Sequence, residues 1–242
     1  MELIQSSIDY ALGEGYWSVK VLGEIDSTQI ALKASTPQHG DVMVAEYQSA
    51  GRGRLDRKFE SQIGTGLLFS AFVQLKRDKA DWGFIPLLVG LSVAEVLGIE
   101  FFTKWPNDIL SDLGKVGGIL CETYGEGIVI GVGINVSTTQ EQLPVTSATS
   151  IFLTTGTSPD RNLLLSAILR EIAFNIEQWE EGDELIEDYL DSSATIGKRV
   201  SVSLPDGRAI VGTATGISLR GELVLDSGAI ISVGDVLHLS LN

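Results

Sequence analysis

Cysteine and histidine are scarce in this 242-residue chain, which has one cysteine, Cys121, and two histidines, His39 and His238. A single cysteine excludes an internal disulfide and a cysteine-based zinc cluster. The histidines lie far apart in the sequence without a ligand partner at helical spacing, so we expect no histidine-based metal site. A lone cysteine suits a reducing compartment, and we expect a cytoplasmic protein.

Positive charge is also in short supply, because 17 Lys and Arg residues face 32 Asp and Glu residues, for a net charge of −15. Such a surface repels phosphate backbones, so we expect no nucleic-acid or anionic-membrane surface, and any anion site must be local. Residues 1–20 lack the basic start and apolar core of a signal peptide, and we find no later run suited to span a bilayer. With 44% hydrophobic residues, the chain is expected to fold into one or two globular domains.

Alternating and β-branched patterns predict a mixed, mostly antiparallel central sheet. The ranges expected to form strands are 41–48, 64–75, 100–110 with a break at the Pro-Asn-Asp turn, 115–124 and 127–136. The last two form a hairpin around Gly125 and Glu126, and both are apolar enough to be central strands.

Helical spacing of apolar residues predicts three helices that flank this sheet. Residues 82–99 have Pro86 in their first turns and end near Gly98. The clearest helix spans 158–181, with Ser158 or Asp160 as its cap, and a shorter one covers 183–190.

Short β-rich runs and glycine turns follow Gly197 and predict a small C-terminal β-barrel. We therefore predict an α+β protein with two domains, residues 1–192 and residues 193–242.

The stretch "AEYQSAGRGRLDRK", residues 45–58, places four cations in an otherwise acidic chain: Arg52, Arg54, Arg57 and Lys58. Glycines that permit tight turns, next to guanidinium groups, are typical of a receptor for phosphate or carboxylate. A solvated turn is the alternative, since like charges held close repel one another.

Two further motifs place polar groups at the ends of apolar strands. "KWPNDIL" brings Lys104, Asn107 and Asp108 together at a rigid Pro turn, although Asn and Asp are also ordinary turn residues. "GKVGGILCE" sets Lys115 before two glycines at 117–118, where a ligand or another backbone must come close, although such a lysine is often only solvated. The recurrence of this pattern favours one shared pocket.

Other motifs are less informative or exclude a function. "IDST", 25–28, offers two hydroxyl groups but is also a common helix cap. "GVGINV", 131–136, lacks the third glycine and the following helix of a dinucleotide fingerprint, so a nicotinamide or flavin enzyme is not expected. We find no P-loop, G-x-S-x-G elbow or Ser-His-Asp set.

In order along the chain, "EIDSTQ", "VAEYQSAGRGRLDRKF", "GTGLLFS", "KWPNDIL", "GKVGGILCE" and "GVGINV" resemble the motifs of the biotin–protein ligase family. The resemblance covers nearly the whole chain and implies the class II synthetase-like fold that biotin and lipoate ligases share. It further implies that residues 1–192 are the catalytic domain. Members join biotin to ATP, with Mg²⁺, as biotinyl-5′-adenylate and then transfer biotin to one lysine of a carrier domain, such as the biotin carboxyl carrier domain of acetyl-CoA carboxylase.

The resemblance also implies site residues. Those expected to contact biotin are Ser27, Thr28, Gln29, Gln48, Arg52, Gly53, Arg54, Lys115, Gly117 and Gly118. Those expected to contact the nucleotide are Arg52, Arg54, Arg57, Lys58, Lys104, Asn107 and Asn135. Lys115 and Arg54 are the expected catalytic groups, while no metal ligand is identified.

Hydroxyl and amide groups suit the neutral urea of biotin, and the cations suit phosphates that arrive with the substrate. We therefore expect the charges of residues 52–58 to be balanced by the substrates, and the loop to be mobile without them.

Three positions depart from the family pattern. Gln29 stands where an Asn is usual, Leu55 and Asp56 interrupt a basic, glycine-containing loop, and Phe59 replaces a common Trp. The loop is therefore expected to be less positive and less flexible than is typical of the family.

Two alternatives belong to the same superfamily or to its regulators. A lipoate ligase or octanoyl transferase shares the fold, but its Arg-Arg and His signature is not found here. A biotin-sensing repressor requires an N-terminal helix-turn-helix domain, for which the stretch before Ser27 is too short, so we expect no DNA binding. A homodimer is compatible with the resemblance, and no membrane contact is expected.

Overall fold

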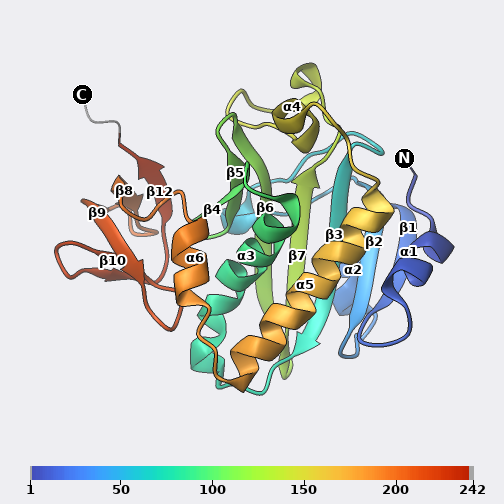
Figure 1. Ribbon diagram of the computed structural model, residues 1–242, viewed down its shortest axis with the longest axis horizontal. Coiled ribbons are helices and arrows are strands. Elements are labelled where there is room, and N and C mark those ends of the chain that lie inside the picture. The colour runs from blue at the N-terminus through green and yellow to red at the C-terminus, as the bar shows by residue number, and fades with distance from the viewer. Residues whose placement is uncertain (1, 240–242) are drawn as a thin grey trace.

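The computed structural model describes residues 2–239, except for the side chain of Asp56, and centres on a seven-stranded sheet (Figure 1). Its strands are β1 Ser18–Ile25, β2 Asp41–Gln48, β3 Gly66–Gln74, β4 Phe102–Lys104, β5 Asp108–Ser111, β6 Gly114–Tyr124 and β7 Gly127–Asn135. Their order across the sheet is β1-β2-β3-β7-β6-β5-β4. Only the β1–β2 pair is parallel among the described strands of this sheet. The predicted mixed, mostly antiparallel sheet is confirmed.

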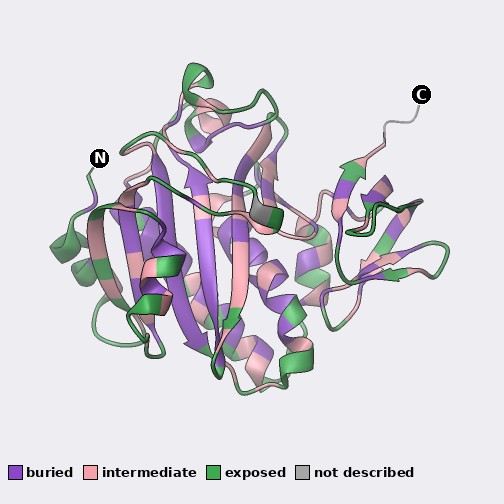
Figure 2. Cartoon of the chain, turned by 180° about the vertical axis from the view of Figure 1, so that it is seen from behind, coloured by how far each residue is buried: buried purple, intermediate pink, exposed green. Residues whose placement is uncertain are grey.

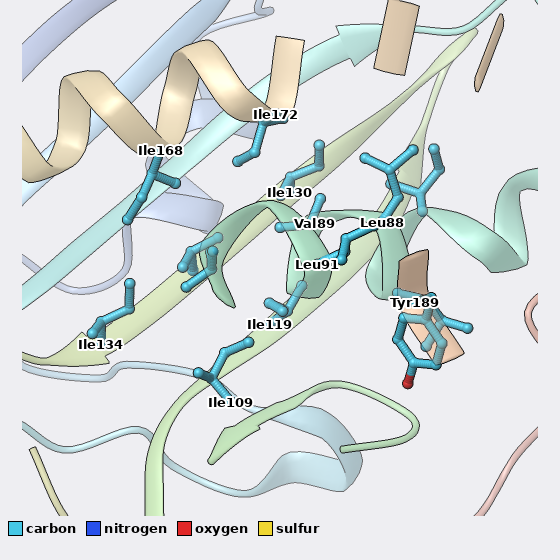
Figure 3. Close-up of a cluster of buried hydrophobic side chains, with 14 of the residues drawn as sticks. Leu88, Val89, Leu91, Ile109, Ile119, Ile130, Ile134, Ile168, Ile172 and Tyr189 are labelled. Atoms are coloured by element: carbon cyan, nitrogen blue, oxygen red, sulfur yellow. The ribbon is translucent and has the colours of Figure 1, made fainter. Parts of the chain in front are cut away.

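Helices cover both faces of this sheet. They are α1 Gln5–Leu12, α2 Thr28–Ala34, α3 Ile85–Leu97, α4 Ile151–Thr155, α5 Arg161–Glu181 and α6 Ile186–Ser192. The long helices α3 and α5 lie over one face, and α2 packs against β2, β3 and β7 on the other (Figure 1). The main core fills the space under α3 and α5, where Ile119, Ile130 and Ile134 of the sheet meet Leu88 and Ile168 (Figure 3).

The predicted hairpin at 115–124 and 127–136 is confirmed as β6 and β7, with Gly125 in the left-handed region at φ 57°. Strand β7 occupies the middle of the sheet, and its residues are apolar or glycine at nearly every position. The Pro-Asn-Asp turn separates β4 from β5 as expected.

The helix predicted at 82–99 begins later than expected, because residues Lys79–Phe84 form a 3₁₀ helix that leads into α3. Pro86 lies in the first turn of α3 and Gly98 ends it, as predicted. By length and composition, Lys79–Leu97 is apolar enough to cross a membrane, which our sequence analysis overlooked. Of its most apolar window, 61% is buried inside the fold. This is the packing of a core helix.

The helix predicted at 158–181 is α5, and Asp160 rather than Ser158 caps it by accepting a hydrogen bond from the backbone NH of Asn162. The short helix predicted at 183–190 is α6, which begins at Ile186 after Leu185. The sequence analysis did not predict α1 or β1. Strand β1 is an edge strand with no fully buried residue, so its pattern carries no clear alternation.

The C-terminal strands form an open sheet, and the predicted β-barrel is therefore wrong. The strands β8 Arg199–Ser203, β9 Ala209–Ile217, β10 Leu223–Leu225, β11 Ile230–Ile231 and β12 Asp235–His238 are ordered β11-β10-β9-β8-β12. Closure would require β11 to pair with β12, but β11 has only two residues and β12 pairs with β8 at the opposite edge. The predicted turns at Gly207, Gly221 and Gly228 are confirmed by their positive φ angles.

A buried tryptophan connects this small sheet to the main one. Trp105 is 1% exposed, and its indole NH donates to the carbonyl oxygen of Gly221 at 2.9 Å. The backbone NH of Trp105 also donates to Thr195 Oγ1 at 3.2 Å. The "KWPNDIL" turn thus fixes the C-terminal sheet as well as the pocket side of the main sheet.

Replacing Trp105 with Phe removes the indole hydrogen bond and leaves the Gly221 carbonyl without its partner. We expect a loss of about 1–2 kcal/mol in the free energy of unfolding. Thermal and urea denaturation measure the change, with Tyr10→Phe, at a 93% exposed position, as the control. Unfolding of the Trp105 variant at the wild-type midpoint would contradict the prediction.

Candidate active site

A cavity of about 190 Å³ lies on the face of the sheet opposite α3, between the start of α2, the β2–β3 connection and the edge of the C-terminal sheet. From this side, the β2–β3 connection crosses in front of the central strands (Figure 2). Thirteen of the expected site residues line the cavity: Ser27, Thr28, Gln29, Gln48, Arg52, Gly53, Arg54, Arg57, Lys58, Lys104, Asn107, Lys115 and Gly118. The shared pocket predicted from the separate motifs is confirmed.

Gly117 and Asn135 do not line this cavity. Gly117 directly precedes Gly118 in β6, so it faces the opposite side of the sheet. Ile109 pairs with Gly117 but Leu110 pairs with Lys115, so Val116 is an extra residue, a β-bulge, in β6. The bulge shifts the alternation of side chains, so that Lys115 shares the cavity face with Gly118. Asn135 is buried and donates from Nδ2 to the carbonyl oxygen of Thr149 at 2.9 Å.

Neutral hydrogen-bonding groups line part of the cavity. The backbone NH and the Oγ1 of Thr28 both donate to Gln48 Oε1, at 2.7 and 3.0 Å, and Thr28 Oγ1 lies 2.8 Å from Ser70 Oγ. Ser27 occupies the N-cap position of α2, but its side chain makes no capping hydrogen bond. The cap interpretation of "IDST" therefore holds for the backbone only, and the Ser27 hydroxyl is available to a ligand.

The glycine- and arginine-rich segment folds on itself as a short hairpin over the cavity. Arg52 and Lys58 form an antiparallel bridge, and the NH groups of Gly53 and Phe59 donate to the carbonyls of Arg57 and Gly51 at 2.7 and 3.0 Å. At its tip, the non-glycine residue Leu55 has φ 53°, in the left-handed region that glycine favours. The side chain of the neighbouring Asp56 lies outside the described part of the structure.

Protein carboxylates already balance two of the four loop cations, contrary to our expectation that the substrates alone would do so. Arg52 contacts Glu122 on β6, and Arg57 contacts Asp235 on β12. Arg54 instead donates to Asn107 Oδ1 at 3.2 Å, and burial lowers the pKa of its guanidinium. Lys58 has no ion pair among the side chains that the structure describes, which do not include that of Asp56.

Lys115 reaches into the cavity from the bulge in β6. Its Nζ lies 2.5 Å from Asp108 Oδ1 and packs over Gly118, where an added Cβ would lie 3.3 Å from Nζ. The absence of a side chain at Gly118 thus leaves room for the ammonium group. Lys115 is 42% exposed, so its contact with Asp108 is exchangeable for a substrate oxygen.

The two unusual residues Gln29 and Phe59 pack on glycines of β7. A Cβ at Gly131 would lie 2.0 Å from Gln29 Oε1, and one at Gly133 would lie 2.8 Å from the Phe59 ring. Gly131 and Gly133 of "GVGINV" therefore make room for cavity-lining side chains rather than for a dinucleotide.

Sequence reasoning missed Ser70, Trp105 and Asp235 as cavity residues. Ser70 stands inside an apolar strand, where a polar residue on the cavity face was the available signal. Asp235 lies 178 positions from Arg57, with which it pairs, and only the arrangement of the two sheets brings them together. No local pattern in the sequence indicates that contact.

Comparisons with known proteins agree with this geometry. Residues 22–138 match the Biotin/lipoate A/B protein ligase family, and residues 195–239 match the Biotin protein ligase C terminal domain. The chain is 37% identical to a biotin–[acetyl-CoA-carboxylase] ligase of Mycobacterium tuberculosis, over 94% of this chain and 91% of that protein. It is 35% identical to the bifunctional ligase/repressor BirA of Escherichia coli, over 88% and 71% of the two chains.

A solved structure gives the same result in three dimensions. The biotin protein ligase of Aquifex aeolicus in complex with biotin and ATP superposes with a TM-score of 0.79 at 32% identity. The match covers 91% of this chain and 97% of that one. With 37% identity to a curated ligase over 94% of its length, and with a matching solved structure, the chain belongs to the biotin protein ligase family.

Proposed function

We propose that this protein is a biotin–protein ligase. It joins biotin to ATP as biotinyl-5′-adenylate and transfers the biotinyl group to a lysine of a carrier domain. One observation carries the proposal: a single cavity is lined both by neutral hydrogen-bonding groups and by six cations. This matches a substrate pair that combines a neutral urea with a polyphosphate.

Ser27, Thr28 and Gln48 are assigned to the ureido ring of biotin. A cyclic urea has one carbonyl acceptor and two NH donors, and hydroxyl groups supply both kinds of partner. The network of Thr28, Gln48 and Ser70 fixes these groups before the substrate arrives, which lowers the entropy lost on binding.

Lys115 and the loop cations are assigned to the reacting groups. In the first step a carboxylate oxygen of biotin attacks the α-phosphorus of ATP, and the bond to pyrophosphate breaks. Negative charge accumulates on the phosphoryl oxygens and on the leaving group, and Lys115 and Arg54 stabilise it from fixed positions. In the second step the carrier lysine attacks the acyl carbon, and AMP leaves.

Arg57, Lys58 and Lys104 are assigned to the nucleotide phosphates, and Asn107 to the nucleotide. Gly117 and Asn135 support this site from outside the cavity, through the bulge in β6 and through Thr149.

Magnesium would be held by the carboxylates of Asp108 and Asp235. Both line the cavity beside the cations, and Mg²⁺ in nucleotide enzymes takes one or two carboxylates together with phosphate oxygens and water. These two carboxylates would suit an ion that arrives with ATP once they exchange their ion pairs with Lys115 and Arg57. When bound, the ion neutralises charge on the polyphosphate.

The carrier is assigned as the biotin carboxyl carrier domain of acetyl-CoA carboxylase, in the cytoplasm. We assign the catalytic unit to residues 1–192 and the small sheet to residues 193–242. The small sheet contributes to the site, because Asp235 and Val236 line the cavity.

The test is biotin- and ATP-dependent release of pyrophosphate, followed by labelling of a purified carrier domain. The same protein is then heated with ATP and either biotin or lipoate. A rise of the melting temperature with biotin only supports the proposal. A rise with lipoate only, together with lipoyl transfer, would replace it with the lipoate ligase that shares the fold.

A further inference from the structure

Glu122, near the end of β6, collects more polar contacts than any assigned role explains. Its Oε2 accepts from Lys33 Nζ at 2.6 Å, from Gln29 Nε2 at 3.0 Å and from Arg52 Nη1 at 3.2 Å. Its Oε1 accepts from Arg52 Nη2 at 3.3 Å. One carboxylate thus joins β6, helix α2 and the loop over the cavity, although Glu122 itself does not line the cavity.

The contact with Gln29 fixes one wall of the cavity. Gln29 is 3% exposed, and its Nε2 also donates to the carbonyl oxygen of Leu120 at 3.1 Å. Because a carboxylate only accepts hydrogen bonds, Glu122 holds the amide with nitrogen toward itself and Oε1 toward Gly131. An Asn at position 29 would be one methylene shorter, so this link depends on the residue found here.

The contact with Arg52 is of a different kind, because it can be given up. Arg52 is 39% exposed in this pair, and exposed ion pairs contribute little to stability. Partial burial would raise the pKa of Glu122, but the hydrogen bond and charge of Lys33, with Gln29 and Arg52, outweigh it and lower the pKa. Lys33 therefore keeps Glu122 paired when Arg52 leaves.

We propose that Glu122 is a positioning residue for biotin. It fixes Gln29 as part of the cavity wall. It also holds Arg52 at the cavity until the carboxylate of biotin replaces Glu122 as the partner of Arg52. Lys33 remains on Glu122 throughout the exchange. This inference rests on the proposed function, in which Arg52 contacts biotin.

Glu122→Gln tests the inference, because it keeps the shape of the side chain and removes its charge. We expect calorimetric affinity for biotin without ATP to fall about tenfold, because Gln29 and Arg52 lose the carboxylate that positions them. In turnover assays the KM for biotin rises, while the KM for ATP does not. Glu126→Gln is the matched control, since Glu126 lies on the β6–β7 turn and pairs with the exposed Lys79. It should change neither value.

Lys33→Met tests the exchange separately and alters a partly exposed side chain whose loss leaves the core intact. Arg52 becomes the only cation on Glu122, so its release costs more and biotin affinity falls. In the Glu122→Gln background, Lys33→Met should cause no further loss. Additive losses, or lower melting temperatures with equal changes in both KM values, would show a merely structural role and overturn the inference.

The outcomes distinguish a failure of this inference from a failure of the proposed ligase function. If the wild-type protein binds biotin and Glu122→Gln binds it equally tightly, the positioning role alone is overturned. A wild-type protein that binds no biotin overturns the proposed function and the positioning role together.

Discussion

Lys115→Ala slows adenylate formation by about 10²-fold, the usual loss when one preorganised donor to a developing charge is removed. The ammonium group reaches the cavity from the bulge in β6 and lies against Asp108, in a contact that a substrate oxygen can replace. Biotin affinity should fall much less than the rate, because the ring contacts of Ser27, Thr28 and Gln48 are untouched.

Single-turnover pyrophosphate release at saturating biotin and ATP measures this step without carrier transfer. Lys115→Arg retains a positive charge and should recover part of the rate. The control is Lys79→Ala, which removes an exposed lysine paired with Glu126, away from the cavity. If Lys115→Ala keeps the wild-type single-turnover rate, Lys115 has no catalytic role and is only a solvated residue near the start of β6.

Much of the central fold could be predicted because its signals are local. Strands β6 and β7 are apolar runs joined by a two-residue turn, and helix α5 has an apolar stripe behind the cap at Asp160. The edge strand β1 carries no such signal, since its partner β2 lies on one side only. Closure of the C-terminal sheet failed as a prediction because it depends on the length of β11, which turn residues do not specify.

The site residues, like the fold, could be predicted where the signal is local in the sequence and not where it depends on distant strands. Lys115 and both glycines were expected to contact biotin, but adjacent residues of a strand face opposite sides of the sheet, so Gly117 faces away from Gly118. The bulge at Val116 brings Lys115 to the face of Gly118. The loop cations were recognised from composition, whereas their partners Glu122 and Asp235 come from distant strands. Polar pairs of this kind leave no periodic pattern in a single sequence.

Arg54 should retain the reactive intermediate within the cavity, and Arg54→Gly should release it. The guanidinium is partly buried at the cavity, donates to Asn107 Oδ1 and lies 3.5 Å from the carbonyl oxygen of Gly234. It therefore connects the loop to both sheets across the nucleotide end of the cavity. Removal of a desolvated, charged contact of this kind typically costs about 2–5 kcal/mol of binding, mostly as faster dissociation.

The expected consequence is a loss of selectivity, because biotinyl-5′-adenylate is a mixed anhydride that any nearby amine can attack. We expect Arg54→Gly to release the intermediate on the order of 10²-fold faster than wild type. It should therefore biotinylate lysines of unrelated proteins. Wild type, Arg54→Gly and the control Arg208→Gly, which alters an exposed turn arginine paired with Asp206, are incubated with biotin, ATP and a lysine-rich bystander protein. A blot for biotin then measures bystander labelling. If Arg54→Gly still forms adenylate but labels the bystander no more than the control does, Arg54 does not retain the intermediate, and its place between the two sheets serves the fold alone.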